Sequence, residues 1–486
     1  MTGLGFPIFN SSNRAGHRPA LLYLPMKKLR SFLLLSLLPA LAPLLSAAPA
    51  PERESAQPSA KYAAIGLPAW ARGSTIYEVN VRQFSVSGKF TAVTAGLPRL
   101  KTLGVDILWL MPIHPIGELH RKGPLGSYYA VKDYLAVNPE FGTEQEFRDF
   151  VTAAHAQGMR VILDWVPNHV SPDNPLTKNH PEFFWRDEQG NLTPPHGTDW
   201  TDVVQFDFKA PGLLDYQANV LLHWVKNFGV DGFRCDVAWG LPTPFWNEIT
   251  KRVRAAKPDA LFLAEAELPQ QQIAAFNLSY GFDLHHAMNQ VAQGKKSASA
   301  IDEAYAKIHA HFPRGGALMV FTSSHDENSW AGTEFERLGA GYAPFAVLTF
   351  LLDGVPLIYN GQEAGLDRRL DFFQRDPIVW PAQPHPAAKL YEVMTALRRA
   401  NPALHTGAPM RRLATTDNAT FYAVERTAGD RKVIGIFNLT ARDAKADLFD
   451  PALAGEWRDA FTGETVKLDA LVPLELKAWR YRVLVK

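Results

Sequence analysis

Short apolar runs alternate with amphipathic helical patterns along most of this 486-residue chain. The runs with the length and composition of buried strands are residues 74–81, 105–112, 160–167, 230–237, 260–267, 280–284, 317–324 and 355–361. Helix ends are recognisable between several of them. Thr143 and Glu146 form a capping-box pattern whose helix is expected to stop near Gly158, and a glycine ends the pattern at 213–229. Eight strands that alternate with helices predict an α/β fold, a parallel (β/α)₈ TIM barrel over residues 69–394.

Two segments break this alternation. Residues 170–208 are rich in Pro, Asn, Asp and aromatic residues, which predicts a small functional excursion after the third strand. From residue 395 the pattern changes to short β-like runs, TFYAVER, KVIGIFNL and AWRYRVLV. We therefore expect a C-terminal all-β sandwich domain over 395–486.

The N-terminal region has the pattern of a secretory signal. From Met26 the sequence has a basic start, a long apolar run interrupted by two prolines, and small residues at 46–48. We expect a leader over residues 1–50, with Met26 as an alternative start, cleavage near residues 48–50, and a linker over 51–68. The mature protein is then exported to the periplasm or the medium and is not held in a membrane.

The charge balance restricts the partners of the chain. There are 50 Lys and Arg residues against 49 Asp and Glu residues, a net charge of +1. This balance argues against nucleic acid or an anionic membrane as the main partner. The single cysteine, Cys235, excludes an internal disulfide.

One predicted strand, DGFRCDVA at 231–238, carries charge inside an apolar setting. Side chains alternate along a strand, so Arg234 and Asp236 share one face and Cys235 points the other way as a packed small hydrophobe. A fixed positive charge beside a carboxylate lowers the pKa of that carboxylate. We therefore expect Asp236 to be ionised, as a nucleophile must be.

Acids also follow other predicted strands, and in such barrels the carboxyl ends of the strands carry the active site. The charged and polar residues in these places are Asp164, Asn168, His169, Arg234, Asp236, Glu265, Glu267, His325 and Asp326. Burying so many acids together costs several kcal/mol in desolvation and mutual repulsion, which a purely structural role does not explain. Glycoside hydrolysis needs such carboxylates, one as nucleophile and one as proton donor. Asp236 fits the first role, and Glu265, whose apolar setting among other acids favours a protonated carboxyl, fits the second.

Six motifs then resemble one family in the order in which that family has them. They are IYEVNVRQF (76–84), DWVPNH (164–169), GFRCDVA (232–238), FLAEAE (262–267), FTSSHDEN (321–328) and VPLIYNGQE (355–363). Over about residues 73–485 the chain resembles the α-amylase superfamily, glycoside hydrolase family thirteen.

This resemblance implies a retaining hydrolase that cleaves α-1,4-glucosidic bonds in starch, maltodextrins or related α-glucans. It implies that Asp236 is the nucleophile, Glu265 the acid/base and Asp326 the third carboxylate. His169 and His325 would contact the sugar, and Tyr129 would stack on it. Arg234 would orient the nucleophile, and Asp164 would pair with that arginine. A retaining enzyme places nucleophile and acid about 5–5.5 Å apart.

Several alternatives stay open at this point. Glu267 competes with Glu265 as the acid, and Tyr128 competes with Tyr129 as the stacking residue, while His169 could be structural. Trp165, Trp200, Trp239 and Trp330 either stack on sugars or pack in the core. An α-glucan transglycosylase or isomerase of the maltose or trehalose type would use the same residues, and a non-catalytic glucan-binding member would lack catalytic acids.

The sequence departs from the family pattern for calcium. Many calcium-binding members have a Lys-His pair soon after the nucleophile, whereas this chain reads DVAWGLP. Asn168 matches a frequent ligand, but calcium takes six to eight oxygens. No cofactor is therefore expected to be required.

Overall fold

A computed structural model describes residues 55–486. The predicted leader over residues 1–50, its cleavage site and the start of the predicted linker lie outside the described residues. Among residues 55–486, no helix is long and apolar enough to cross a membrane. The described part of the expected linker contacts the barrel domain: Ala63 forms a parallel bridge with Arg314, and Leu67 packs against the apolar interior of the barrel.

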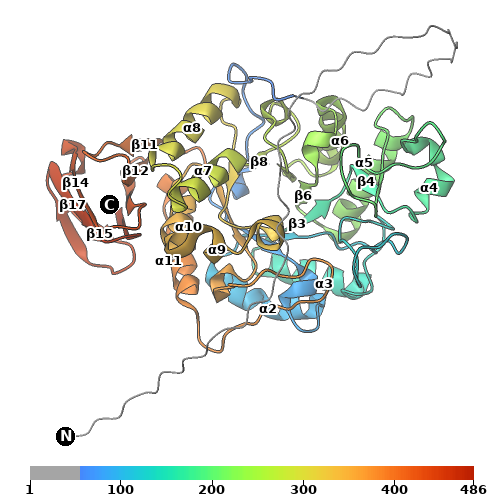
Figure 1. The fold of residues 1–486 in the computed structure, drawn as a ribbon, viewed down its shortest axis with the longest axis horizontal. Coiled ribbons are helices and arrows are strands. Elements are labelled where there is room, and N and C mark those ends of the chain that lie inside the picture. Colours follow the sequence, from blue (N-terminus) through green and yellow to red (C-terminus); the bar gives the residue numbers. More distant parts are fainter. Residues whose placement is uncertain (1–54) are drawn as a thin grey trace, which may run out of the picture. The chain divides into compact units, whose positions relative to one another are not determined.

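Eight parallel strands form the closed barrel that the alternation predicts (Figure 1). In barrel order they are β1 (Ile76–Val79), β10 (Val355–Tyr359), β9 (Leu318–Val320), β8 (Leu278–Tyr280), β7 (Leu261–Ala264), β6 (Gly232–Cys235), β3 (Arg160–Trp165) and β2 (Ile107–Leu110). The longer helices outside them are α2 (Phe90–Leu103), α3 (Glu144–Ala156), α5 (Leu213–Phe228), α6 (Thr243–Ala256), α7 (Phe282–Ala292), α8 (Ser299–His311), α10 (Tyr342–Leu351) and α11 (Pro386–Ala400). The TIM-barrel prediction is confirmed.

Helix ends follow the local signals in the sequence. At the start of α3 the Thr143 hydroxyl accepts the Glu146 N–H at 3.1 Å, and the Glu146 carboxylate accepts the Thr143 N–H at 2.7 Å. This reciprocal pair satisfies backbone donors that a helix start otherwise leaves free. At the end of α5, Gly229 adopts a φ of 74°, which a residue with a side chain rarely adopts.

The strand expected at 280–284 is misplaced. β8 ends at Tyr280, and α7 already begins at Phe282, so YGFDL spans a strand end and a helix start. The true strand was hidden because it is short and has a polar centre. The Ser279 hydroxyl accepts a hydrogen bond from the Gln272 side chain at 2.9 Å, which makes its burial tolerable.

A glycine lets β6 approach β7 closely. A Cβ at Gly232, where φ is 156°, would lie 2.0 Å from the carbonyl oxygen of Leu261. β6 and β7 pair in parallel, with Arg234 opposite Leu263. The close approach brings the end of β6 beside the end of β7, while Cys235 faces outward into the apolar core.

The excursion expected at 170–208 forms irregular structure held at its base by two short strands. β4 (His169–Val170) and β5 (Val204–Gln205) pair antiparallel, with His169 opposite Gln205. Between them lie the short helix α4 (Leu176–Asn179) and a 3₁₀ turn. The pairing fixes the backbone of His169 at the rim of the barrel.

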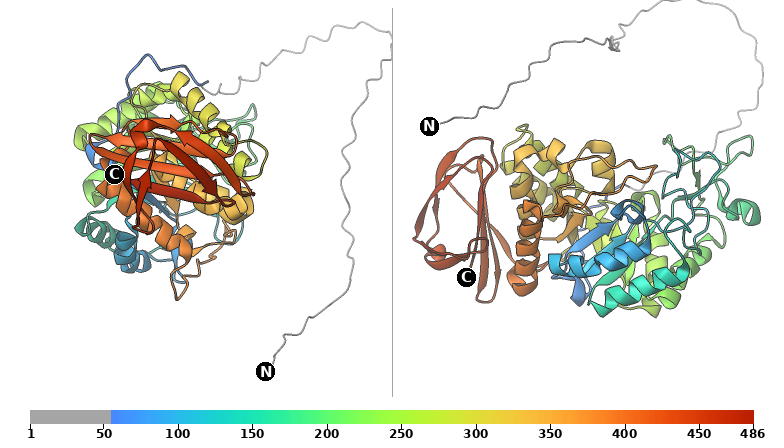
Figure 2. Two further views of the ribbon diagram at one scale, coloured as in Figure 1. Left: turned by 90° about the vertical axis from the view of Figure 1, so that its left-hand side faces the viewer. Right: turned by 90° about the horizontal axis from the view of Figure 1, so that it is seen from below.

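The C-terminal part consists of two antiparallel sheets (Figure 2). The larger has the order β11 (Met410–Leu413), β12 (Phe421–Ala428), β13 (Arg431–Asn438), β18 (Tyr481–Val485), β15 (Gly455–Asp459) and β16 (Thr465–Leu468), and the smaller pairs β14 (Ala444–Phe449) with β17 (Leu471–Leu476). Apolar residues of both sheets share one core. The boundary expected at residue 395 falls inside α11, because that helix still packs on α10 and α2 of the barrel.

Candidate active site

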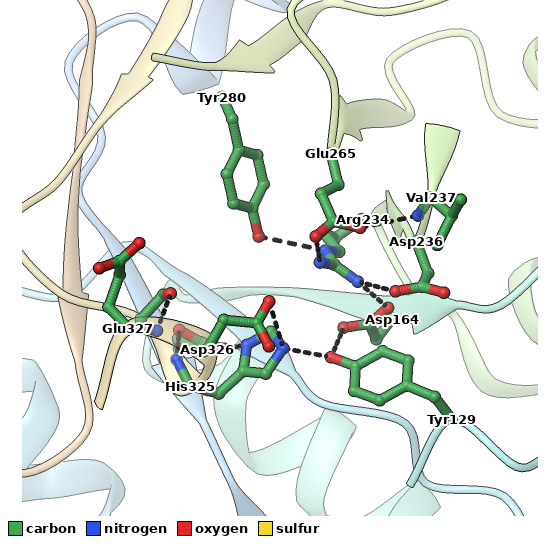
Figure 3. Close-up of polar contacts among 12 residues, drawn as sticks. Tyr129, Asp164, Arg234, Asp236, Val237, Glu265, Tyr280, His325, Asp326 and Glu327 are labelled. Atoms are coloured by element: carbon green, nitrogen blue, oxygen red, sulfur yellow. Dashed lines mark hydrogen bonds and ion pairs between the residues drawn. The ribbon is translucent and has the colours of Figure 1, made fainter. Parts of the chain in front are cut away.

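A pocket of about 580 Å³ opens at the carboxyl ends of the barrel strands. The predicted site residues that line it are Tyr129, His169, Asp236, Glu265, His325 and Asp326. Arg234 and Asp164 are fully buried beneath them. Figure 3 shows how the labelled side chains lie around the Arg234 guanidinium, among them Tyr129, Asp164, Asp236, Glu265, His325 and Asp326.

The Arg234 guanidinium connects three carboxylates. Its Nη1 donates to Asp164 Oδ1 and to Asp236 Oδ1, each at 2.9 Å, and its Nη2 lies 3.2 Å from Glu265 Oε1. Nε donates to the Tyr280 hydroxyl at 3.2 Å. Planar donors in a fixed fork suit this bridging task. One cation therefore holds the acids of β3, β6 and β7 in fixed relative positions.

Asp236 has one oxygen bound and one free. Its Oδ1 accepts from Arg234, whereas its buried Oδ2 has no hydrogen-bond partner. Because Asp236 lines the pocket, this unpaired oxygen is available to a ligand there. A buried polar atom without a partner is costly and calls for a functional explanation.

The expected lowering of the Asp236 pKa is wrong. Burial, followed by repulsion from Glu265, raises the pKa of Asp236 well above its ordinary value, although Arg234 opposes this. Burial likewise raises the pKa of Asp164 to about 6. The reason is the number of acids: a single buried guanidinium is shared by three of them. Burial and the neighbouring acids thus oppose the ionisation of Asp236 more strongly than Arg234 favours it.

The two candidate acids of β7 point to different places. Glu265 Oε2 accepts the Val237 N–H at 2.7 Å and Glu265 lines the pocket. Glu267 instead accepts the N–H of Asp283 in the first turn of α7 at 3.1 Å, and burial raises the pKa of Glu267 to about 7. Alternation along a strand could not separate them, because the chain leaves β7 at Ala264 and no longer alternates.

Behind Asp326 lies a buried charge pair that the sequence reasoning missed. Glu78 of β1 contacts His325 Nδ1 at 2.5 Å and also accepts the His325 backbone N–H at 3.3 Å. Burial alone lowers the pKa of His325, but the carboxylates of Asp326 and Glu78 outweigh it and raise that pKa to about 9. The sequence signal that could have indicated this pair is Glu78 itself, an acid inside the otherwise apolar strand IYEV.

A directed chain of hydrogen bonds continues from His325. With Nδ1 donating to Glu78, Nε2 donates to the Tyr129 hydroxyl at 2.8 Å, and that hydroxyl donates to Asp164 Oδ2 at 3.1 Å. Burial raises the pKa of Tyr129 well above its ordinary value, so the phenol keeps its proton. The chain requires His325 to carry both ring protons, in agreement with its raised pKa.

Tyr129 and Tyr128 occupy different environments. The Tyr129 ring stacks on His325 with centroids 5.5 Å apart and lines the pocket. Tyr128 is buried against the Arg82 guanidinium, 4.1 Å from its ring centroid. The structure therefore brings Tyr129, and not its neighbour, to the site.

His169 and Asn168 lie at the start of the excursion. His169 is buried beside Trp200, and burial lowers its pKa to about 3, so it is neutral. Asn168 Oδ1 is buried without a hydrogen-bond partner and is the one feature here that suits calcium. Within residues 55–486, however, no three His, Cys, Asp or Glu side chains converge as metal ligands. One amide oxygen falls far short of what calcium takes, so these residues do not fit the ion.

Two of the four tryptophans left open line the pocket, namely Trp200 and Trp330. Trp165 is buried in the core against Tyr134, and Trp239 packs against the core without lining the pocket. Sequence reasoning also missed the lining residues Lys122, Asp199, Asp202, Phe372 and Phe373. These lie in loops, where no periodic pattern indicates which side chains face inward.

The whole chain was compared with known proteins. Residues 53–377 match the alpha amylase catalytic domain. The chain is 28% identical over 417 residues to the α-amylase MalA of Haloarcula japonica, covering 81% of this chain and 60% of that protein. It is 29% identical over 453 residues to the α-1,4-glucan:maltose-1-phosphate maltosyltransferase of Myxococcus xanthus, covering 84% and 65%. The chain thus spans less than two thirds of the length of both curated relatives.

A solved structure agrees with these matches. The crystal structure of an α-amylase from Lactobacillus plantarum superposes with a TM-score of 0.77 at 32% identity, covering 86% of this chain and 99% of that one. The family match covers most of the chain, and the barrel carries its acids at the strand ends. The chain belongs to the α-amylase family, glycoside hydrolase family thirteen.

Proposed function

We propose that the protein hydrolyses α-1,4-glucosidic bonds in starch, maltodextrins or related α-glucans with retention of configuration. The observation that carries this proposal is the unpaired Oδ2 of Asp236, a residue that lines the pocket together with Glu265 while Arg234 holds both acids. A nucleophile and a proton donor fixed on one guanidinium are what a double displacement needs.

In the first step, Asp236 Oδ2 attacks the anomeric carbon while the bond from that carbon to the glycosidic oxygen breaks. Glu265 gives its proton to the departing oxygen, and a covalent glycosyl ester forms on Asp236. Arg234 donates a hydrogen bond to Asp236 but only an ion contact to Glu265. This asymmetry favours Asp236, whose free oxygen is oriented by that hydrogen bond, as the nucleophile and Glu265 as the proton donor.

In the second step, Glu265 takes a proton from water, and the resulting hydroxide oxygen bonds to the anomeric carbon. The ester bond breaks and Asp236 leaves as a carboxylate, so both acids return to their starting states. Asp326, with a side chain 46% exposed at the pocket, accepts hydrogen bonds from sugar hydroxyls. Tyr129, His169 and His325 contact the sugar ring that is attacked.

The same residues could transfer a glucosyl unit to a sugar instead of water, as a transglycosylase or isomerase does. The maltosyltransferase relative is named for a phosphorylated sugar, which needs a cation at the site. Among the described residues, the carboxylates lining this pocket are Asp199, Asp202, Asp236, Glu265 and Asp326, and the cations are Lys122 and His325. Both ring nitrogens of His325 are already bound, to Glu78 and to Tyr129. The Lys122 ammonium already donates to the Asp199 carbonyl at 3.1 Å and lies 3.4 Å from Asp202. An acidic pocket with its lysine engaged favours a neutral glucan over a sugar phosphate.

Two further properties belong to the proposal. The protein works without calcium, because the residues around Asn168 do not fit that ion. It is exported, because residues 26–48 have a basic start, an apolar run and small residues in the order of a secretory signal. A non-catalytic role is disfavoured, because Asp236, Glu265 and Asp326 are all in place at the pocket.

The main test compares wild-type enzyme with Asp236→Asn and Glu265→Gln on soluble starch and maltotriose. We expect the wild type to release reducing sugar, and each variant to lose about three orders of magnitude in kcat, as removal of a group central to the chemistry does. Glu267→Gln is the matched control and should stay within about threefold of wild type, because Glu267 binds α7 outside the pocket. Longer oligosaccharides in place of net hydrolysis would support the transferase, and inactivity on both substrates would contradict the glucan proposal.

Glu78→Gln tests the charge pair with His325. The folded-state pKa of His325, about 9, lies above its ordinary value of 6.5, so the pair stabilises the fold fully below pH 6.5 and stops doing so as the pH rises through 9. We expect the variant to be about 1–3 kcal/mol less stable than wild type at pH 6, with the difference shrinking by pH 9.5. Thermal midpoints across this range would measure it.

The control for that experiment is Glu363→Gln. Glu363 is also a buried acid beside a barrel strand, but its partners are Tyr77 and Arg99, and the pKa of each lies above this range. The stability loss of this variant should therefore be the same at pH 6 and pH 9.5. A pH-independent loss for Glu78→Gln as well would contradict an imidazolium at His325.

Removal of divalent metal tests the calcium proposal. Dialysis against EDTA should leave the thermal midpoint and the rate of starch hydrolysis unchanged, because no cluster of His, Cys, Asp or Glu side chains among the described residues could hold a metal ion. A fall in the midpoint that added calcium restores would show that Asn168 belongs to a calcium site after all.

Expression of the full chain in a Gram-negative host tests export. The mature protein should appear in the periplasm or medium with an N-terminus near residues 48–50, as determined by N-terminal sequencing. A variant with glutamate in place of Lys27, Lys28 and Arg30 should remain unprocessed, because the basic start is part of the signal. An unprocessed wild type in the cytoplasm would contradict export.

A further inference from the structure

Three aromatic side chains extend the pocket outward from Tyr129. Phe372 lies parallel to Tyr129, with ring centroids 6.3 Å apart and planes at 11°. Trp330 packs on Phe372 at 5.2 Å and on Phe373 at 6.0 Å. Trp330, Phe372 and Phe373, here called the aromatic platform, all line the pocket.

Trp330 is exposed in spite of its size. Its relative exposure is 56%, whereas Phe372 beneath it is 9% exposed. Burying a tryptophan is strongly favourable, so an exposed ring on a pocket wall leaves apolar area free for a ligand. The apolar face of a pyranose ring is a ligand that such a surface fits.

The platform is held rigidly by the segment that follows Asp326. Glu327–Ala331 forms a turn of π-helix, which presents Trp330. Asn328, inside this turn, accepts the Leu370 N–H at 2.8 Å and donates to the Arg368 carbonyl at 3.1 Å. These bonds tie the Trp330 segment to the loop that carries Phe372 and Phe373. π-Helical turns of this kind frequently occur at functional sites.

The position of the aromatic platform relative to Glu265 indicates which part of the substrate contacts the platform. Glu265, the proposed proton donor, must lie beside the leaving group, and it contacts Arg234 and the Val237 N–H. The platform adjoins Tyr129 and His325, which Figure 3 shows across Arg234 from Glu265. The platform therefore lies on the side of the attacked sugar that is away from the leaving group.

We propose that Trp330, supported by Phe372 and Phe373, binds the glucosyl unit next to the attacked one on its non-reducing side. This inference rests on the proposed hydrolase function and makes the enzyme prefer substrates with at least two glucosyl units before the cleaved bond. Asn328 is a positioning residue that keeps both halves of the platform together.

The test compares 4-nitrophenyl α-glucoside, which has one sugar before the cleaved bond, with 4-nitrophenyl α-maltoside, which has two. For Trp330→Ala we expect kcat/KM to fall about tenfold on the maltoside and to stay within about twofold on the glucoside, since one aromatic contact is lost. Trp330→Phe should keep most of the preference. Val379→Ala is the matched control and should change neither value, because Val379 is an exposed apolar residue of the loop that carries Phe372 and Phe373 and does not line the pocket.

Equal losses on both substrates would overturn the proposal, because Trp330 would then act through Asp326 and not through a second sugar. No loss on either substrate would overturn it as well. Calorimetry with maltotriose and Asp236→Asn enzyme, with and without Trp330→Ala, gives a readout that needs no turnover. Weaker binding in the double variant supports the platform even if the wild type proves to transfer sugars, whereas a wild type inactive on every α-glucoside contradicts the proposed function itself.

Discussion

The active site depends on the contact of one guanidinium with three carboxylates. Arg234 is fully buried and holds Asp164, Asp236 and Glu265 at 2.9, 2.9 and 3.2 Å. The charge of Arg234 can be buried because it is paired with carboxylates, and the carboxylates can lie close together because this positive charge offsets their mutual repulsion. With three acids on one cation, burial raises the pKa of Asp236 and of Asp164 even though Arg234 opposes the rise.

The barrel supplies the geometry for that contact. Gly232 lets β6 approach β7 so closely that a Cβ would meet the Leu261 carbonyl. Asp236 and Glu265, each immediately after its strand, then meet the same guanidinium. A second line of support runs from Glu78 through His325 and Tyr129 to Asp164, and each hydrogen bond in it sets the direction of the next. Sites held by interlocked partners on strands keep their geometry better than sites on loops.

Loops decide what surrounds this fixed centre. The excursion, tied at its base by β4 and β5, brings His169 and Trp200 to one wall, and the π-helical turn after Asp326 brings Trp330 to another. Amylases and maltosyltransferases occur among the relatives, so the common barrel does not separate hydrolysis from transfer. Under the proposed function, these walls are where the acceptor and the preferred chain length would be decided.

The sequence by itself determined the eight strands, with one misplaced at 280–284, and the acids that end them, because period and motif are local properties. It also indicated the residues that line the pocket on strand ends. Only the tertiary structure decided that the pKa of Asp236 is raised, that Glu267 turns to α7, that Glu78 backs His325 and that Trp330 faces the pocket. The physical reason is that a pKa and a direction of approach depend on burial and on charges from distant segments, and a chain read in order does not reveal which of them meet.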